Sequence, residues 1–125
     1  MRQVTRNVDV DEARDLLERV PRACCCFARD DGPQPVPIAL AWRGGRYLAG
    51  IPDEAGGRPV PGQEVVVLVD EGVHWFDLRA VLIRGPVKPT EPPKGAATGL
   101  IWFEVTPLKI VAWDYGKLRE VNDKA

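Results

Sequence analysis

The stretch QEVVVLVDEGVHWFDLRAVLIRG, residues 63–85, decides the fold. Its first part, residues 63–70, is apolar on both faces of an extended chain, which is typical of a strand in the middle of a sheet. A Glu-Gly turn at residues 71 and 72 then leads into a long strand expected over residues 73–85. That strand alternates between one packed and one mixed face, formed by Phe76, Leu78, Ala80 and Leu82 and by Asp77, Arg79 and Val81, respectively.

Five further stretches have the composition of strands, because β-branched and aromatic residues gather there between glycine- and proline-rich turns. They are residues 23–29, 35–42, 46–51, 100–106 and 109–114. The connections 52–62 and 86–99 are rich in glycine and proline, so no regular structure is expected in them. Seven short strands predict an all-β protein with a flanking helix, as a closed or nearly closed antiparallel barrel. One domain is expected over residues 1–125.

The segment DVDEARDLLERV, residues 9–20, is the clearest helix of the sequence. Asp9 is the expected N-cap, and Glu12 follows three residues later as in a capping box. Apolar residues recur on one side of this segment, and Pro21 ends it. The tail, residues 115–125, predicts either a short helix or a frayed end.

Composition restricts the function. The chain has 125 residues and a net charge of −1, without a basic stripe, so nucleic acid is a poor partner. No apolar run reaches membrane-spanning length, and the N-terminus lacks the apolar segment of a signal peptide. The odd number of cysteines agrees with a reducing compartment, so a cytoplasmic protein is expected.

Three consecutive cysteines, Cys24, Cys25 and Cys26, and one histidine, His74, match the ligand count of a structural zinc site. On a strand, however, Cys24 and Cys26 point to one face and Cys25 to the other, so the three thiols cannot converge on one metal. We therefore expect no metal site and interpret the cysteines as small packing residues on a buried strand. A reactive thiol is the alternative. His74 is expected at the surface or half-packed, without a catalytic partner.

The common catalytic signatures are absent from the sequence. There is no phosphate-binding GxxxxGK[ST], no GxGxxG, no HExxH and no GxSxG. The carboxylates are scattered, so no pair is assigned acid and base roles from spacing. The catalytic residues are therefore not identified, and function is expected to reside in the barrel itself.

Three stretches together resemble the pyridoxamine 5′-phosphate oxidase-like family of flavin-binding split barrels. They are DGPQPVPIALAW (31–42), VVVLVDEGVHWFDLRAVLIRGPV (65–87) and WFEVTPLKIVAWDYGKL (102–118), the last similar to the closing strands of small actinobacterial-type members. The resemblance implies a six-stranded split barrel and a homodimer. It also implies FMN, or a related deazaflavin coenzyme, in a groove between the subunits, and therefore flavin-dependent oxidoreductase activity on an unidentified substrate.

The resemblance also implies site residues. The backbone of Pro37, Ile38 and Ala39 would face the flavin ring, and Ala49 and Gly50 would lie near the ribityl chain and phosphate.

Arg79 would reach the polar edge of the flavin ring, and Trp113 would close the pocket from the partner subunit. The alternative for Arg79 is a cross-strand salt bridge with Asp77 or Glu104. The mixed face of the long strand, which begins with Trp75, suits a subunit interface, although the four tryptophans fit a core equally well.

The segment 52–62 departs from the family pattern. Flavin-binding members have a short basic helix there, whereas this chain has glycines, prolines, two acids and one arginine, Arg58. Arg58 is thus the expected phosphate ligand, and its isolation leaves a second function open, a cofactor-free dimeric barrel that binds a small ligand or a protein partner. Haem binding through His74 is a third possibility.

Overall fold

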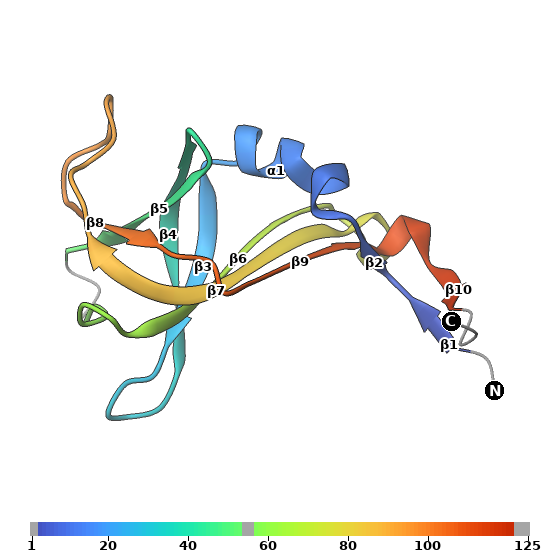
Figure 1. The fold of residues 1–125 in the computed structure, drawn as a ribbon, viewed down its shortest axis with the longest axis horizontal. Coiled ribbons are helices and arrows are strands. Elements are labelled where there is room, and N and C mark those ends of the chain that lie inside the picture. Colours follow the sequence, from blue (N-terminus) through green and yellow to red (C-terminus); the bar gives the residue numbers. More distant parts are fainter. Residues whose placement is uncertain (1–2, 54–56, 122–125) are drawn as a thin grey trace.

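The computed structural model describes residues 3–53 and 57–121, and Figure 1 shows their arrangement. The strands are β1 (Gln3–Thr5), β2 (Asn7–Val8), β3 (Arg22–Phe27), β4 (Gln34–Arg43), β5 (Arg46–Pro52), β6 (Glu64–Glu71), β7 (Arg79–Pro89), β8 (Leu100–Val105), β9 (Lys109–Asp114) and β10 (Arg119–Val121). The helices are α1 (Arg14–Arg19) and three 3-10 turns, η1 (Val10–Ala13), η2 (Trp75–Asp77) and η3 (Tyr115–Lys117).

Six of these strands close into a barrel. They follow the order β7-β6-β3-β4-β5-β8, and β8 returns to pair with β7. All of these pairs are antiparallel. Strands β9 and β2 extend the sheet beyond β7, and β1 pairs separately with β10. The predicted antiparallel barrel with a flanking helix is therefore confirmed, with two further strands attached to it.

Strand β7 makes closure possible because it changes partner along its length. Its first part, Arg79 to Arg84, pairs with β9, and its last part, Val87 to Pro89, pairs with β8. The change occurs at the buried Gly85. A Cβ on Gly85 would collide with the backbone of Thr106, which crosses it on the way from β8 to β9. This crossing accounts for a glycine at that position.

The core fills the barrel with aliphatic side chains from the inner faces of the strands, and α1 covers one end. Leu16 of α1 and Val69, Val81 and Ile83 of the central hairpin have no exposed surface. Each such side chain contributes about 1.5–3 kcal/mol through burial. Helix α1 therefore packs against the core and closes one end of the barrel. We call this helix the plug.

Two expectations for the hairpin formed by β6 and β7, the central hairpin, are wrong. The long strand begins at Arg79 and not at residue 73, because Gly72 has a φ of 136° and residues 75–77 form a 3-10 turn. Asp77 N–H donates to the His74 carbonyl (2.9 Å) in this turn. Of the residues expected on the packed face, Ala80 is buried, but the face is otherwise reversed. Val81 and Ile83 face the core, whereas Leu82 is half-buried on the outside.

The expected helix over residues 9–20 is shorter and is not capped as predicted. Residues 10–13 form a 3-10 turn, and α1 covers only residues 14–19. The Asp9 side chain makes no cap hydrogen bond. Instead, the Glu12 N–H donates to the Asp9 carbonyl at 3.0 Å.

Two segments that were expected to be irregular, residues 86–99 and the tail, contain regular structure. β7 continues to Pro89, so the connection 86–99 begins as a strand. In the tail, residues 115–117 form a 3-10 turn and residues 119–121 form β10, which pairs with β1. Strands β1 and β2 were not predicted. Residues 54–56 of the expected loop and 122–125 of the tail lie outside the described residues.

Candidate functional site

A cavity of about 590 Å³ opens at the barrel end opposite α1, between the β3–β4 hairpin and the segment that leads into β6. Its volume lies in the range of small-molecule sites, about 300–1,000 Å³. We call this cavity the loop pocket. Its lining residues are Phe27, Ala28, Arg29, Asp30, Asp31, Gln34, Gly57, Arg58, Val60 and Gln63.

Gln63 fixes the two walls of the loop pocket relative to each other. Its Nε2 donates to the Ala28 carbonyl at 2.8 Å, and its Oε1 accepts from the Val60 N–H at 3.0 Å. On the hairpin side, Gln34 Nε2 donates to Asp31 Oδ2 at 2.9 Å. Gln63 therefore links the two walls, and the hydrogen bond between Gln34 and Asp31 stiffens the hairpin wall.

Two arginines give the loop pocket its cationic groups. The Arg29 guanidinium lies 5.4 Å from the centroid of the Phe27 ring, and Arg58 has a long contact of 3.5 Å to Asp53. Guanidinium groups suit phosphate because they donate two parallel hydrogen bonds. Asp30 and Asp31 lie on the same wall and reduce the positive potential. Because Phe27 itself is only 5% exposed, the pocket presents mainly the polar and cationic groups of its loops.

Of the eight residues predicted to bind a cofactor, Arg58 lines the loop pocket and the others lie elsewhere. Ile38 and Ala49 belong to the core cluster, so their side chains point into the barrel. Pro37 is exposed on the outer face of β4. It lies three residues along the strand from Gln34 of the pocket, about 10 Å away.

Gly50 is covered by an aromatic ring. It pairs with Ala39 on one side and with Trp102 on the other. A Cβ on Gly50 would lie 2.7 Å from the Trp102 indole, so the ring rests directly on the glycine. Trp102 Nε1 is buried and has no hydrogen-bond partner within the described structure. Ligand contact at Gly50 therefore requires the indole to move.

Arg79 binds α1 rather than either predicted partner. Its Nη2 lies 2.5 Å from Asp15 Oδ1 and also donates to the Glu12 carbonyl at 2.9 Å. The salt-bridge alternative was thus right in kind, but the expected partners Asp77 and Glu104 were wrong. Glu104 instead accepts from Arg46, at 2.7 Å. Hydrogen bonds from Arg79, and then from Arg19, hold the pKa of Asp15 well below its usual range.

Trp113 lies on β9, opposite Asn7 of β2 and Ala80 of β7. The Arg6 guanidinium lies 4.8 Å from its ring centroid. Trp113 is near Arg79 but at the other end of the sheet from the loop pocket. Within one subunit, the eight predicted residues therefore form no single site.

The three cysteines alternate as predicted for a strand. Cys25 is buried, Cys24 is exposed and Cys26 is half-buried on the opposite face. Burial raises the pKa of the Cys25 thiol to about 12, so it is not a nucleophile at neutral pH. Among the described residues, no three of His, Cys, Asp or Glu gather as metal ligands.

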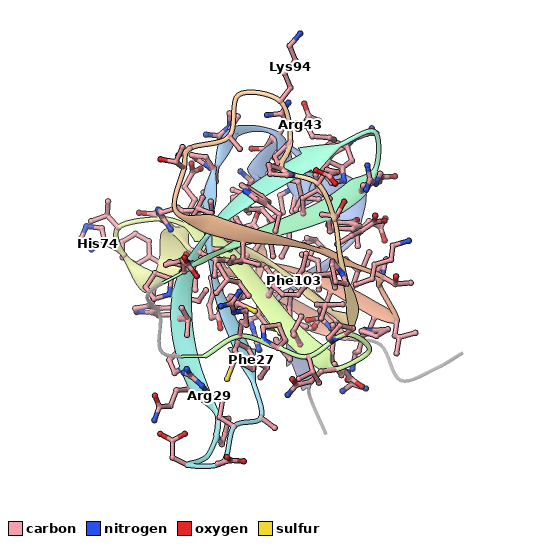
Figure 2. All side chains as sticks on the ribbon, turned by 90° about the vertical axis from the view of Figure 1, so that its left-hand side faces the viewer. Phe27, Arg29, Arg43, His74, Lys94 and Phe103 are labelled. Atoms are coloured by element: carbon pink, nitrogen blue, oxygen red, sulfur yellow. The ribbon has the colours of Figure 1, made fainter. Side chains whose placement is uncertain are left out.

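His74 is exposed and stacks on Phe76 at 5.2 Å between ring centroids. Figure 2 shows it far from Phe27 and Arg29 of the loop pocket.

Sequence reasoning missed Arg29 and Gln63 because no linear motif marks them. The two residues are 34 positions apart and meet only through the antiparallel pairing of β3 with β6. A signal did exist, since extending the Cys26–Val66 register by three residues places Arg29 opposite Gln63.

No helix in the described part of the chain is long and apolar enough to span a membrane.

Comparison with known proteins shows the fold. No family model and no curated protein matches the sequence. Among solved structures, an FAD-binding protein from Mycobacterium smegmatis is 16% identical, with a TM-score of 0.67 over 93% of this chain and 98% of its own. A candidate pyridoxamine 5′-phosphate oxidase from Corynebacterium glutamicum is 14% identical, with a TM-score of 0.63 over 88% of this chain and 96% of its own.

A haem-binding protein from Mycobacterium smegmatis is 11% identical, with a TM-score of 0.62 over 89% of this chain and 56% of its own. These similarities show that the chain has the split-barrel fold, as the resemblance implied.

Proposed function

We propose that this protein binds a flavin and acts as a flavin-dependent oxidoreductase. The observation that carries the proposal is the loop pocket, a pre-organised cavity with Arg29 and Arg58 in its wall at the open end of the barrel. Support comes from the names of structural neighbours, which include FAD-binding proteins and a candidate pyridoxamine 5′-phosphate oxidase.

The described residues fit an elongated ligand with a phosphate at one end. Arg58 and Arg29 would hold the phosphate, and Gln63 would keep the two walls in place. The flavin ring would extend from the pocket along the outer face of β4, toward Pro37 and Ala39. When bound, the flavin would supply the hydride and electron transfer, and the protein would supply binding and orientation.

We further propose that the protein is a homodimer, because a row of apolar side chains lies uncovered on the outer face. The registers align five residues across five strands. Pro37 and Cys24 are exposed, and the other three are half-buried. Facing residues of paired strands lie on the same side of the sheet, so the five form one band around the outside of the barrel, the apolar stripe. Its members are Pro37 of β4, Cys24 of β3, Leu68 of β6, Leu82 of β7 and Val111 of β9. Because β4 lies opposite β7, a single partner would cover only the part on the neighbouring strands β6, β7 and β9.

A titration of FMN followed by the quenching of its fluorescence tests flavin binding. Arg58→Ala and Arg29→Ala should each weaken binding about 10–100-fold, since a hydrogen bond to a charged group contributes about 1.5–3 kcal/mol. Arg43→Ala is the matched control, because Arg43 is an exposed arginine at the end of β4 away from the pocket. The Arg43→Ala protein should bind FMN with the same dissociation constant as the wild type.

Absence of saturable binding of FMN, of FAD and of a deazaflavin would reject the proposal. The second candidate would then stand, a barrel that binds a small ligand without a cofactor. Asp30 and Asp31 favour that candidate, because their charges in the wall oppose a phosphate dianion. A ligand screen that follows thermal stability would identify it, with Arg58→Ala as the variant that loses the shift.

A further inference from the structure

Two of the three consecutive cysteines share the outer face of the barrel. Cys24 is exposed and Cys26 is half-buried, whereas Cys25 points into the core. Side chains alternate between the two faces of a strand, so Cys24 and Cys26 are direct neighbours along the outer face of β3. Neither residue lines the loop pocket. The pair is thus a second group of chemically reactive side chains, separate from that pocket.

Strand β3 holds the two cysteines at a fixed separation. From Cys24 to Cys26 the strand is paired on both sides, with β4 and with β6. Two residues along a strand cover about 6.6–6.8 Å, and the Cβ atoms of the pair are about equally far apart. A disulfide requires Cβ atoms about 3.5–4.5 Å apart. The two sulfurs therefore cannot bond to each other while the strand keeps both of its partners.

A metal ion can bridge the same separation, because it places two bonds between the sulfurs. A metal–thiolate bond is about 2.3 Å long, so an ion in line with two thiolates holds the sulfurs about 4.6 Å apart. Side chains on a strand can lean along the strand direction, and two sulfurs that lean toward each other reach this distance. The spacing of the pair is too long for a disulfide and suits an ion with two ligands.

The residues that face the pair determine which ion fits. On both neighbouring strands they are proline or aliphatic, and none can coordinate a metal: Pro35, Pro37, Val66 and Leu68. Zinc takes four ligands in structural sites and three from the protein in catalytic sites. Thiolates are soft ligands that select Cu(I), and this ion is stable between only two of them. Two thiolates in apolar surroundings therefore favour Cu(I) over zinc.

A cation lies beside the pair. Arg22 is two residues before Cys24 on the same face of β3, and its Nη1 has a long contact of 3.5 Å to Asp70 Oδ1. The two side chains are 66% and 45% exposed. Two thiolates with one Cu(I) carry a net charge of −1, and a neighbouring guanidinium stabilises such a charge.

We propose that Cys24 and Cys26 form a two-coordinate site for a soft monovalent metal ion, of which Cu(I) is the biological example. Each thiol loses its proton on binding, and both sulfurs bond to the ion. The copper stays Cu(I), so no oxidant or reductant is consumed. The site lies on β3, beside the strands β6, β7 and β9 that the proposed dimer covers. Binding of the ion requires neither a flavin nor a second copy of the chain.

Competition with a coloured Cu(I) chelator tests the site. Reduced protein is titrated without oxygen into Cu(I) bicinchoninate, and the loss of colour reports the transfer of the ion. The wild type should take one Cu(I) per chain. Cys24→Ala and Cys26→Ala should each weaken binding by about 100-fold or more, because the second thiolate no longer acts at a high effective concentration. Cys25→Ala is the matched control, which removes the buried thiol and should bind like the wild type.

Protection of the thiols gives a second readout. Without the ion, a thiol reagent should modify two cysteines of the folded protein, because the third is buried. One equivalent of Cu(I) should protect both of them together. Protection of only one cysteine by one equivalent would show that the thiols do not share an ion, and would overturn the proposal.

Three further results would overturn it. The first is wild-type affinity for Cu(I) in either the Cys24→Ala or the Cys26→Ala protein, and the second is a wild type that takes no Cu(I) from the chelator. The third is one ion per two chains in native mass spectrometry, because the ion would then bridge two molecules. None of these readouts involves a flavin, so this site and the proposed function stand or fall separately.

Discussion

The two ends of the barrel use their arginines differently. At the end closed by α1, Arg79 and Arg19 are in short contact with Asp15 and Glu71, at 2.5–3.0 Å. At the open end, Arg58 has a longer contact of 3.5 Å to Asp53 in a solvent-exposed loop. Short, mutual contacts hold a helix on the barrel, whereas a long contact is easily exchanged for a ligand. The ion pairs of the closed end therefore contribute to stability, whereas the open end is where we propose that a ligand binds.

The largest expected effect separates the two ends by stability. Leu16→Ala removes a fully buried side chain from the plug, and the free energy of unfolding should fall by about 2–5 kcal/mol. Val60→Ala at the open end, where the side chain is exposed, should change it by no more than about 0.5 kcal/mol. Urea denaturation followed by tryptophan fluorescence measures both. Similar losses in the two variants would contradict the division of roles.

A smaller effect is expected at the amide that holds the pocket walls. Gln63→Ala removes two hydrogen bonds, to Ala28 and Val60, so unfolding should become easier by about 1–2 kcal/mol. The same variant should bind FMN more weakly, because the cavity loses its fixed shape. Gln34→Ala, which removes one exposed hydrogen bond to Asp31, is the control with the smaller loss. If the Gln63→Ala protein bound FMN as tightly as the wild type, the hydrogen bonds of Gln63 would not be needed for binding.

The strands were predictable from the sequence because their composition agrees with their packing. The two strands β5 and β9, for example, lie within one residue of the expected bounds. The failure at residues 73–78 has a local cause. Aromatic residues favour a strand there, but Gly72 takes a φ of 136° that turns the chain out of the sheet.

The pocket was harder to predict than the strands. Arg58 was identified because it is the one arginine of its loop, whereas Arg29 belongs to the site only through the pairing of β3 with β6. Strands β1 and β10 were missed for the same reason, because each forms only by pairing with a segment at the other end of the chain. Local patterns thus predict elements, and long-range register decides which loops share a cavity.

The closed end should also respond to acid. Hydrogen bonds from Arg79 and Arg19 lower the pKa of Asp15, and the hydrogen bond from Arg19 lowers that of Glu71. A group whose pKa is lowered by folding adds stability above its unfolded value, about 4, and that stability is lost as the pH falls through and below this value. Asp15→Asn should therefore cost about 1 kcal/mol at pH 7, a modest amount because the pair is partly exposed to solvent.

The difference between wild type and Asp15→Asn should then shrink as the pH is lowered from 6 to 3, because the wild-type protein loses the ion pair that the variant already lacks. Urea denaturation at several pH values measures the difference. Glu18→Gln is the matched control, since Glu18 lies on the same helix but has a 3.5 Å contact with Arg14 in which both side chains are more than half exposed. A difference that stays constant from pH 6 to pH 3 would show that Asp15 does not hold the plug through its charge.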